Sequence, residues 1–156
     1  MKQPPMKSKS YTSPAPSMLL LVLLLTLLVG CAETNHDPEP SVQDKTRSKM
    51  IANHWIIQAV KVDGVDRSLI YNGLTIRFGE SSFETTNGGE VWPTSGLWQF
   101  TTADATIIKR NDGIEIQVEV TEAMLRLTLQ WAKTTYAGGR QNSVKGTNIF
   151  TFVKTP

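Results

Sequence analysis

The side chains that most often carry out catalysis are few in this chain and are poorly grouped. His54 is the only histidine in the segment that we expect to fold, and that segment contains neither a cysteine nor a Gly-x-Ser-x-Gly motif. A serine or cysteine nucleophile would therefore lack a matched base. Glycoside hydrolysis needs two positioned carboxylates, but Asp63 and Asp66 belong to a turn sequence. Glu115 and Glu119 fit the solvent face of a strand, so we expect no catalytic residue and no enzymatic activity.

The oxygen-rich turns do not predict a metal site. Asp63-Gly64 and Asn111-Asp112-Gly113 carry carboxylate and amide oxygens, yet each is too short for a calcium-binding loop. His36 and Asp37 have no second cluster of ligands near them in the sequence. Asn87-Gly88-Gly89 does not open a helix, so it is typical of a hairpin connection rather than of a phosphate loop. We expect neither a metal ion nor a cofactor.

The one cysteine, Cys31, lies in a pattern that predicts a covalent modification. It follows Leu28-Val29-Gly30 at the end of an apolar run, Met18 to Val29, and the residues before that run include lysines but no acidic side chain. This layout is typical of a bacterial lipoprotein signal, in which the cysteine is acylated and becomes the first residue of the mature chain. The apolar run has 12 residues, whereas a membrane-spanning helix needs about 20. An uncleaved membrane helix and a buried free thiol are the weaker alternatives.

Lipid attachment predicts where the protein acts. Residues 1–30 would be removed as a signal peptide, leaving two or three acyl chains such as palmitate on Cys31. These chains would anchor the protein stably, because each buried CH₂ contributes about 0.8 kcal/mol. Ala32 stands where an aspartate would favour retention in the inner membrane. We therefore expect a cell-envelope protein on the outer membrane, on either its periplasmic or its surface face.

The rest of the chain divides into a tether and one domain. Residues 31–50 are polar, contain Pro38 and Pro40 and show no apolar period, so we predict a flexible tether. Residues 51–156 are long enough for a single domain with its own core. Three of the 16 basic residues lie in the leader, which leaves 13 against 14 acidic residues in residues 31–156 and a net charge near −1. This charge does not support nucleic-acid binding.

Alternating apolar and polar residues predict a succession of strands in residues 51–156. In the clearest case Ile114, Ile116 and Val118 share one face, and polar residues occupy the other. Turn signals such as Asp63-Gly64 separate the strands. The expected strands cover 54–62, 74–78, 81–86, 96–101, 105–110, 114–120, 125–131 and 144–154. No helical period is evident. We therefore predict an all-β fold, a single eight-stranded antiparallel up-and-down barrel, with a β-sandwich as the alternative.

Several segments of this domain carry a family resemblance. They are Asn53-His54-Trp55, Val62-Asp63-Gly64-Val65-Asp66, the stretch NGGEVWPTSGLW from Asn87 to Trp98, and Trp131 to Arg140 followed by Phe150-Thr151-Phe152. Together they resemble the small lipocalin-like, calycin-type lipoproteins of the Bacteroidota. The resemblance spans residues 51–156 and implies a lipocalin-like barrel that holds a small apolar ligand, with Trp55 at its floor. Lys154 or Arg77 would pack over Trp55. The chain departs from the family pattern at Asn53, which stands where the Gly-x-Trp motif has glycine.

Eight aromatic residues fall on faces that we expect to point into the barrel. They line an apolar ligand pocket if the barrel is wide, and they fill it if the barrel is narrow. These residues are Trp55, Phe78, Phe83, Trp98, Phe100, Trp131, Phe150 and Phe152. Trp92 lies beside Pro93 in a loop, where it is either an exposed recognition residue at the barrel mouth or a lid folded over the core. A second possible mouth loop carries Tyr136 and Arg140.

Two functions remain open from the sequence. The first is a lipid-anchored envelope protein that binds or sequesters a small apolar ligand in its barrel. The second is a structural or interaction lipoprotein, whose solid barrel presents the loops Asn87–Ser95 and Lys133–Asn142 to a partner protein of the envelope. The expected partners are thus the membrane, through the lipid, together with a small hydrophobic ligand or an envelope protein.

Overall fold

The computed structural model describes residues 38–133 and 144–155, which form a mostly β domain. Two short helices precede or interrupt the strands, α2 (Val42–Ile51) and the 3₁₀ helix η1 (Ser68–Tyr71). The strands are β1 (His54–Val62), β2 (Val65–Asp66), β3 (Thr75–Phe78), β4 (Ser82–Thr86), β5 (Ser95–Phe100), β6 (Ile107–Arg110), β7 (Glu115–Val120), β8 (Met124–Trp131) and β9 (Gly146–Lys154). All eight predicted strands are present, and the two-residue strand β2 is additional.

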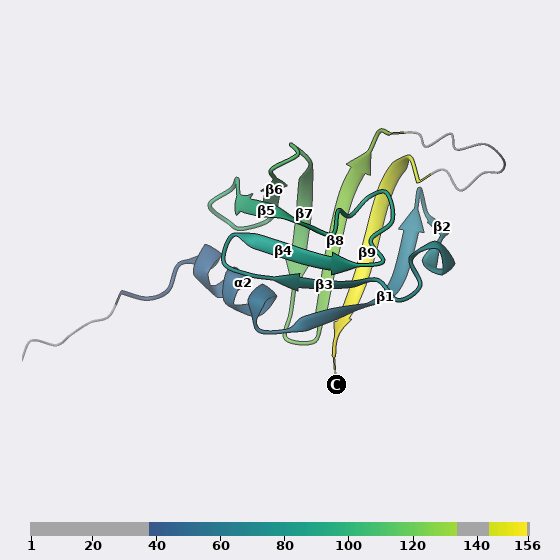
Figure 1. Cartoon of the computed structure of the whole chain (residues 1–156). Coiled ribbons are helices and arrows are strands. Elements are labelled where there is room, and N and C mark those ends of the chain that lie inside the picture. Colours follow the sequence, from purple (N-terminus) through teal and green to yellow (C-terminus); the bar gives the residue numbers. More distant parts are fainter. Residues whose placement is uncertain (1–37, 134–143, 156) are drawn as a thin grey trace, which may run out of the picture. The chain divides into compact units, whose positions relative to one another are not determined.

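The sheet closes on itself because its first and last long strands pair. From β3 onward each strand is antiparallel to the next, and β1 pairs with β9 from Trp55↔Lys154 to Val62↔Asn148. In Figure 1, β3 and β4 cross in front of β8 and β9, as expected for a strongly coiled sheet. The predicted eight-stranded antiparallel up-and-down barrel is confirmed.

A bulge in β1 makes this closure possible. The pairing with β9 shifts register between Ile57 and Ala59, so β1 carries one extra residue there. On its other side β1 pairs with β3 before the bulge and with β2 after it. The buried positions change from Trp55 before the bulge to Val60 and Val62 after it. The bulge therefore bends the strand while keeping apolar side chains inside.

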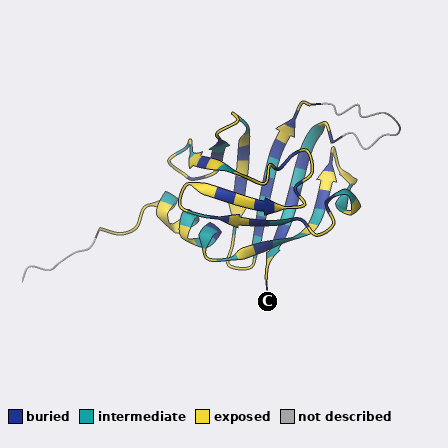
Figure 2. Ribbon diagram, in the orientation of Figure 1, coloured by how far each residue is buried: buried dark blue, intermediate teal, exposed yellow. Residues whose placement is uncertain are grey.

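The core lies inside the barrel and follows the predicted alternation. Along β8 every second residue from Leu125 to Trp131 is buried, and along β9 Phe150 and Phe152 are fully buried. Figure 2 shows this alternation as dark bands across β8 and β9. Of the eight aromatic residues expected inside, seven are buried and Phe100 is partly buried against them.

The prediction of a flexible tether through residue 50 is wrong for its second half. The folded unit begins at Glu39, and residues 42–51 form α2. Ser41 caps the helix by accepting a hydrogen bond from the Asp44 backbone N–H at 3.1 Å, and the Asp44 carboxylate accepts one in return from the Ser41 N–H. Met50 is fully buried and ties the helix to the core. One buried side chain leaves no apolar period for sequence reasoning to detect.

Helix α2 covers one end of the barrel, which we call the closed end. Gln43 donates a hydrogen bond to the Thr102 carbonyl oxygen in the β5–β6 connection at 2.9 Å. The Nε atom of Arg47 lies 3.7 Å from the Oε2 atom of Glu80, in the β3–β4 turn. Lys49 pairs at 3.4 Å with Glu122 in the β7–β8 turn. The helix thus contacts three turns that meet at the same end.

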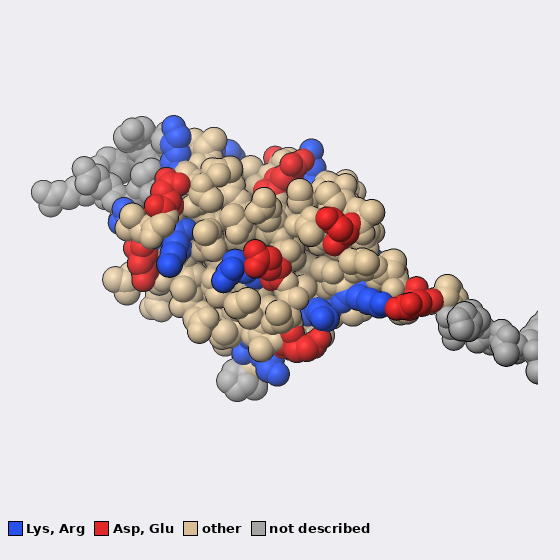
Figure 3. Space-filling model, turned by 180° about the vertical axis from the view of Figure 1, so that it is seen from behind, with Lys and Arg blue, Asp and Glu red and all other residues tan. Residues whose placement is uncertain are grey.

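Charged side chains of both signs are interspersed over the face shown in Figure 3. Exposed ion pairs of the domain include Lys109 with Glu115 and Arg126 with Glu119. This distribution agrees with the near-zero net charge of residues 31–156. Within the described ranges, neither helix is long and apolar enough to cross a bilayer.

The burial of Met50 tests whether α2 is part of the domain. Replacing Met50 with alanine should lower the free energy of unfolding by about 2–5 kcal/mol, as for other buried methionines. Val42 lies on the same helix with 54% of its surface exposed, so Val42→Ala should change stability by less than about 0.5 kcal/mol. Urea unfolding measures both values. Equal, negligible effects would mean that residues 42–51 are a tether after all.

Candidate binding site at the barrel mouth

The two ends of the barrel are built differently. Helix α2 covers the closed end, and Figure 1 shows η1 at the opposite end, which we call the mouth. The mouth is bounded by η1, by the loop of residues 87–94 between β4 and β5, and by the β6–β7 turn. We call the adjoining parts of the interior the closed half and the mouth half.

Aromatic rings fill the closed half. The Trp98 ring meets Phe78 edge-on at 5.7 Å and Phe100 edge-on at 5.1 Å, measured between centroids. Phe83 continues this row at 6.4 Å from Phe78. Such edge-to-face contacts are the favoured geometry for packed aromatic side chains. Of the two interpretations left open, a filled barrel is therefore the one that holds in this half.

Among the described residues, the cation–π contacts of the closed half involve Trp98 and Phe100, whereas Lys154 or Arg77 was expected over Trp55. Lys154 and Arg77 are both exposed. Instead the guanidinium carbon of Arg47, on α2, lies 5.8 Å from the centroid of the Trp98 ring and 5.4 Å from that of Phe100. Trp55 does lie at the floor, fully buried. Its position is fixed by α2, because its indole N–H donates to the Met50 carbonyl oxygen at 2.8 Å.

Trp92 is a lid rather than an exposed recognition residue. Only 2% of its surface is exposed, so the interpretation as an open aromatic at the mouth is wrong. Its ring meets Phe83 at 5.9 Å and Phe150 at 5.7 Å, both edge-on. The loop is held in this position where Thr85 donates from its hydroxyl to the Pro93 carbonyl oxygen at 2.7 Å. The loop 87–94 therefore folds inward and inserts Trp92 between two strands' aromatic side chains.

A buried arginine supports the lid from below. Arg110, with 2% of its surface exposed, donates from Nη1 to the Val91 carbonyl oxygen at 2.8 Å. Its guanidinium carbon lies 5.2 Å from the Trp92 ring centroid, within the range of a cation–π contact. Asp112 accepts two hydrogen bonds from the same guanidinium, one of them from Nε at 3.1 Å. These bonds hold the pKa of the Asp112 carboxyl below its usual value.

Sequence reasoning missed Arg110 as an interior residue. A signal was present, because Ile108 and Arg110 alternate with exposed or partly exposed neighbours on β6. Buried arginines are rare, however, so the charge argues against an inward position. Tyr71 and Asn148 were also missed, because their polar groups argue against an inward position, although Asn148 shares the inward face of β9 with Phe150.

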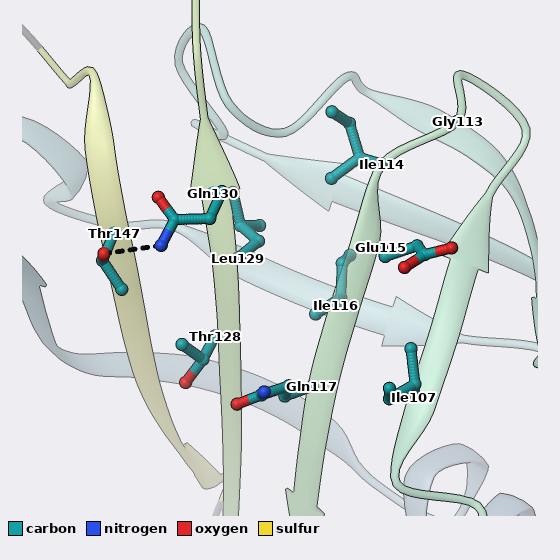
Figure 4. Close-up of a pocket in the computed structure, with 10 residues that line it drawn as sticks. All are labelled: Ile107, Gly113, Ile114, Glu115, Ile116, Gln117, Thr128, Leu129, Gln130 and Thr147. Carbon is teal, nitrogen blue, oxygen red and sulfur yellow. Dashed lines mark hydrogen bonds between the residues drawn. The ribbon is translucent and has the colours of Figure 1, made fainter. Parts of the chain in front are cut away.

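A surface groove formed by described residues lies on the outside of the barrel. It has a volume of about 610 Å³ and runs over β6, β7, β8 and β9. Figure 4 shows it lined by Ile107, Glu115, Gln117 and Thr128, with Gln130 donating to the Thr147 hydroxyl at 2.7 Å. Its mixed polar and apolar lining contains no group poised for chemistry.

The residues considered for catalysis and metal binding are exposed or make hydrogen bonds that hold strands and turns in place. His54 is exposed, and its carbonyl oxygen accepts hydrogen bonds from the backbone N–H and the hydroxyl of Thr155. Asp63 accepts a hydrogen bond from the Thr147 N–H at 2.8 Å, and Asp66 accepts one from the Ser68 N–H at 2.8 Å. In the described part of the chain, no three His, Cys, Asp or Glu side chains are grouped as metal ligands. Cys31, Tyr136 and Arg140 lie outside the described residues.

In comparisons with known proteins, no family model and no curated protein matches this chain. The likeness to lipocalins therefore rests on the barrel itself. Its closed eight-stranded antiparallel topology is compatible with a lipocalin-like fold.

The tight fit of the lid predicts the effect of a small substitution at Gly88. A Cβ atom there would lie 2.6 Å from the Trp92 Cβ and would also overlap the Trp92 carbonyl oxygen. Gly88→Ala should therefore displace the loop, cost about 1–3 kcal/mol of stability and expose Trp92. All four tryptophans are buried in the native protein, so acrylamide quenching of fluorescence should rise clearly in the variant.

Gly79→Ala is the matched control. A Cβ at Gly79 would meet only the Ser82 hydroxyl closely, at 2.8 Å, and that hydroxyl can rotate away. This variant should quench like the native protein. Unchanged quenching in Gly88→Ala would contradict the packed lid.

The pairing of Arg110 with Asp112 predicts a pH-dependent effect. Asp112→Asn should lower the free energy of unfolding by about 1–3 kcal/mol at pH 7, because buried Arg110 loses its carboxylate. Folding lowers the Asp112 pKa, so this stabilisation is complete above the unfolded value near 4 and is lost as pH falls through the folded value. The native and Asp112→Asn proteins should therefore converge in acid unfolding curves. Glu115→Gln, in an exposed pair, should change stability by less than about 0.5 kcal/mol, and a pH-independent Asp112→Asn effect would refute the assignment.

Proposed function

We propose that this protein is a lipid-anchored envelope protein that binds a small, largely apolar molecule in the mouth half of its barrel. The observation that carries the proposal is the difference between the two ends. Helix α2 and packed aromatic rings close one end, whereas the other is covered by the loop 87–94. A barrel closed at one end and covered by a loop at the other has the architecture of a receptacle.

The loop is the element that would move to admit a ligand. It makes few backbone hydrogen bonds, such as Trp92 N–H to the Gly88 carbonyl oxygen at 3.2 Å, and its position depends on the contacts of Trp92 and Arg110. Loops of this kind open at lower cost than paired strands do. The walls around Trp92, formed by Phe83 and Phe150, are apolar and aromatic and would suit a ligand with an apolar body.

The lipid anchor is the second part of the proposal. It is supported by the signal pattern that ends at Cys31. Because the chain joins the barrel through α2, an anchor on Cys31 would tether the closed end and leave the mouth free to receive its ligand. This combination of signal pattern and barrel supports our proposal that the protein is similar to the small lipocalin-like lipoproteins of the Bacteroidota.

A docking function is the second candidate, favoured by the outer groove of Figure 4. Its lining includes the partly exposed Ile107 and Ile114 beside hydrogen-bonding side chains, which is the mixture found in protein interfaces. In this alternative the barrel is a scaffold for an envelope protein.

Mass spectrometry of the protein purified from its own host tests the proposal. The denatured chain should begin at Cys31 and carry the mass of two or three acyl chains, and Cys31→Ser should abolish incorporation of labelled palmitate. Under native conditions a noncovalent small molecule should accompany the folded protein. A mature chain without acylation refutes the anchor, and a protein that is always free of small molecules refutes the binding function.

A further inference from the structure

The four tryptophans of this protein differ in whether their indole N–H group has an acceptor, and this difference distinguishes the two halves of the barrel. In the closed half both indole N–H groups have acceptors: Trp55 donates to Met50, and Trp98 donates to the Ser82 carbonyl oxygen at 2.9 Å and the Gly79 carbonyl oxygen at 3.2 Å. In the mouth half, the indole nitrogens of Trp92 and Trp131 are buried and have no hydrogen-bond partner among the described residues. Trp131 is only 5% exposed.

Two further polar side chains in the mouth half share this property. The hydroxyl of Tyr71 and the Oδ1 atom of Asn148 are buried and lack partners, although these residues are 1% and 0% exposed. The amide nitrogen of Asn148 is satisfied by the Val144 carbonyl oxygen at 2.7 Å, so only its oxygen remains. Burial, and to a lesser extent the charge of Glu90, raises the pKa of Tyr71 to about 12, so its hydroxyl stays protonated and can donate.

All four groups belong to one section of the interior. The rings of Tyr71 and Trp92 both contact Phe150, at 5.0 Å and 5.7 Å between centroids. Asn148 precedes Phe150 by two residues on the same inward face of β9. Trp131 lies on the inward face of β8, opposite Gly146 and next along that face from Leu129, which pairs with Asn148. The four side chains therefore surround the same stretch of strands β8 and β9.

Unpartnered buried polar groups are uncommon in native proteins, because each has given up its hydrogen bonds to water without gaining new ones. Four of the five such side-chain atoms found among the described residues lie in the mouth half. The fifth, Arg47 Nε in the closed half, has a charged neighbour, Glu80, at 3.7 Å. This distribution points to a site in the mouth half that is completed by a bound molecule. We infer that Trp92, Trp131, Tyr71 and Asn148 form the polar part of a ligand site, which takes a neutral small molecule with an apolar body and a hydroxyl or primary amide group. This inference rests on the proposed binding function and specifies its ligand.

The chemistry of the four groups defines this ligand class. The two indoles can only donate, Asn148 Oδ1 can only accept, and the Tyr71 hydroxyl can do either. A hydroxyl or primary amide both accepts and donates, so it can serve both kinds of group at once. The single buried cation of this region, among the described residues, is Arg110, and its charge is already met by Asp112. The site therefore offers no unmatched buried positive charge to a carboxylate; Lys133, whose Nζ lies 5.4 Å from the Trp131 ring centroid, is exposed to solvent.

A pair of nearly isosteric probes tests the inference. We expect 2-naphthol to bind at least tenfold more tightly than 2-methylnaphthalene, because a site built to hydrogen-bond a hydroxyl discriminates against an analogue that lacks it. Isothermal titration calorimetry measures both affinities on the protein as purified from its host, in lipid nanodiscs with empty nanodiscs as the blank. Trp131→Phe, which removes one N–H group and keeps an aromatic ring, should reduce the ratio to about threefold or less.

Trp98→Phe is the matched control, since its N–H group is satisfied in the closed half, and it should leave the ratio unchanged. Tyr71→Phe removes one oxygen atom and provides a second test if Trp131→Phe does not fold. If the native protein binds both probes equally, or binds 2-naphthol more weakly, the inferred hydrogen-bonding site is wrong, but the proposed binding of an apolar molecule in the barrel is still supported. If it binds neither probe and also fails to bind palmitate, the proposed binding function fails with it.

Discussion

The structure depends on the antiparallel pairing of β1 with β9. This pairing joins the first and last long strands of the meander and converts an open sheet into a barrel with a definite interior. It satisfies the backbone of both strands, which would otherwise be exposed edges. It also requires the bulge between Ile57 and Ala59, because β1 must serve β3 at one end and β2 at the other while facing β9 throughout. Without this closure the inward aromatic side chains would have no common core.

The two ends of the closed barrel are covered by different elements and stabilised by different contacts. At the closed end, α2 provides the acceptor for the Trp55 indole and the cation that lies over Trp98, and the Nε atom of that cation, Arg47, is ion-paired with Glu80 at 3.7 Å. At the mouth a loop inserts Trp92, and Arg110 compensates by bonding the loop backbone and stacking on the ring. That arrangement buries apolar surface but leaves polar atoms without partners. The closed end is thus held by α2, whereas the loop 87–94 covers the mouth and leaves buried polar atoms there without hydrogen bonds among the described residues.

The strands of this fold could be predicted from the sequence because their apolar residues alternate. Ile116 and Val118 on β7, and Leu125 to Trp131 on β8, follow a period of two that survives in the structure. The bulge in β1 could not be predicted in the same way, since it moves the buried positions from odd to even residue numbers within one strand. The helix α2 was hidden because it buries a single side chain, Met50, although Ser41 and Asp44 form a capping pair that could have indicated its start.

The site was harder to predict than the strands, because apolar alternation does not reveal polar residues that point inward. The aromatic residues expected inside are inside, but the residues that distinguish the mouth are polar: Arg110, Tyr71 and Asn148. The polarity of these side chains argues against burial. The register of β6 and β9 places Arg110 and Asn148 inside, and the 3₁₀ helix η1 places Tyr71 there. Whether Trp92 was exposed or folded inward depended on the path of an irregular loop, which local propensity does not determine.

The most direct test of this account is an NMR titration of the ¹⁵N-tryptophan-labelled protein with 2-naphthol, in which each indole N–H group gives its own signal. The account predicts that the signals of Trp92 and Trp131 shift with the probe, while those of Trp55 and Trp98 stay in place because their N–H groups are already bound within the closed half. Four unaffected signals, or shifts at Trp55 and Trp98 alone, would contradict it.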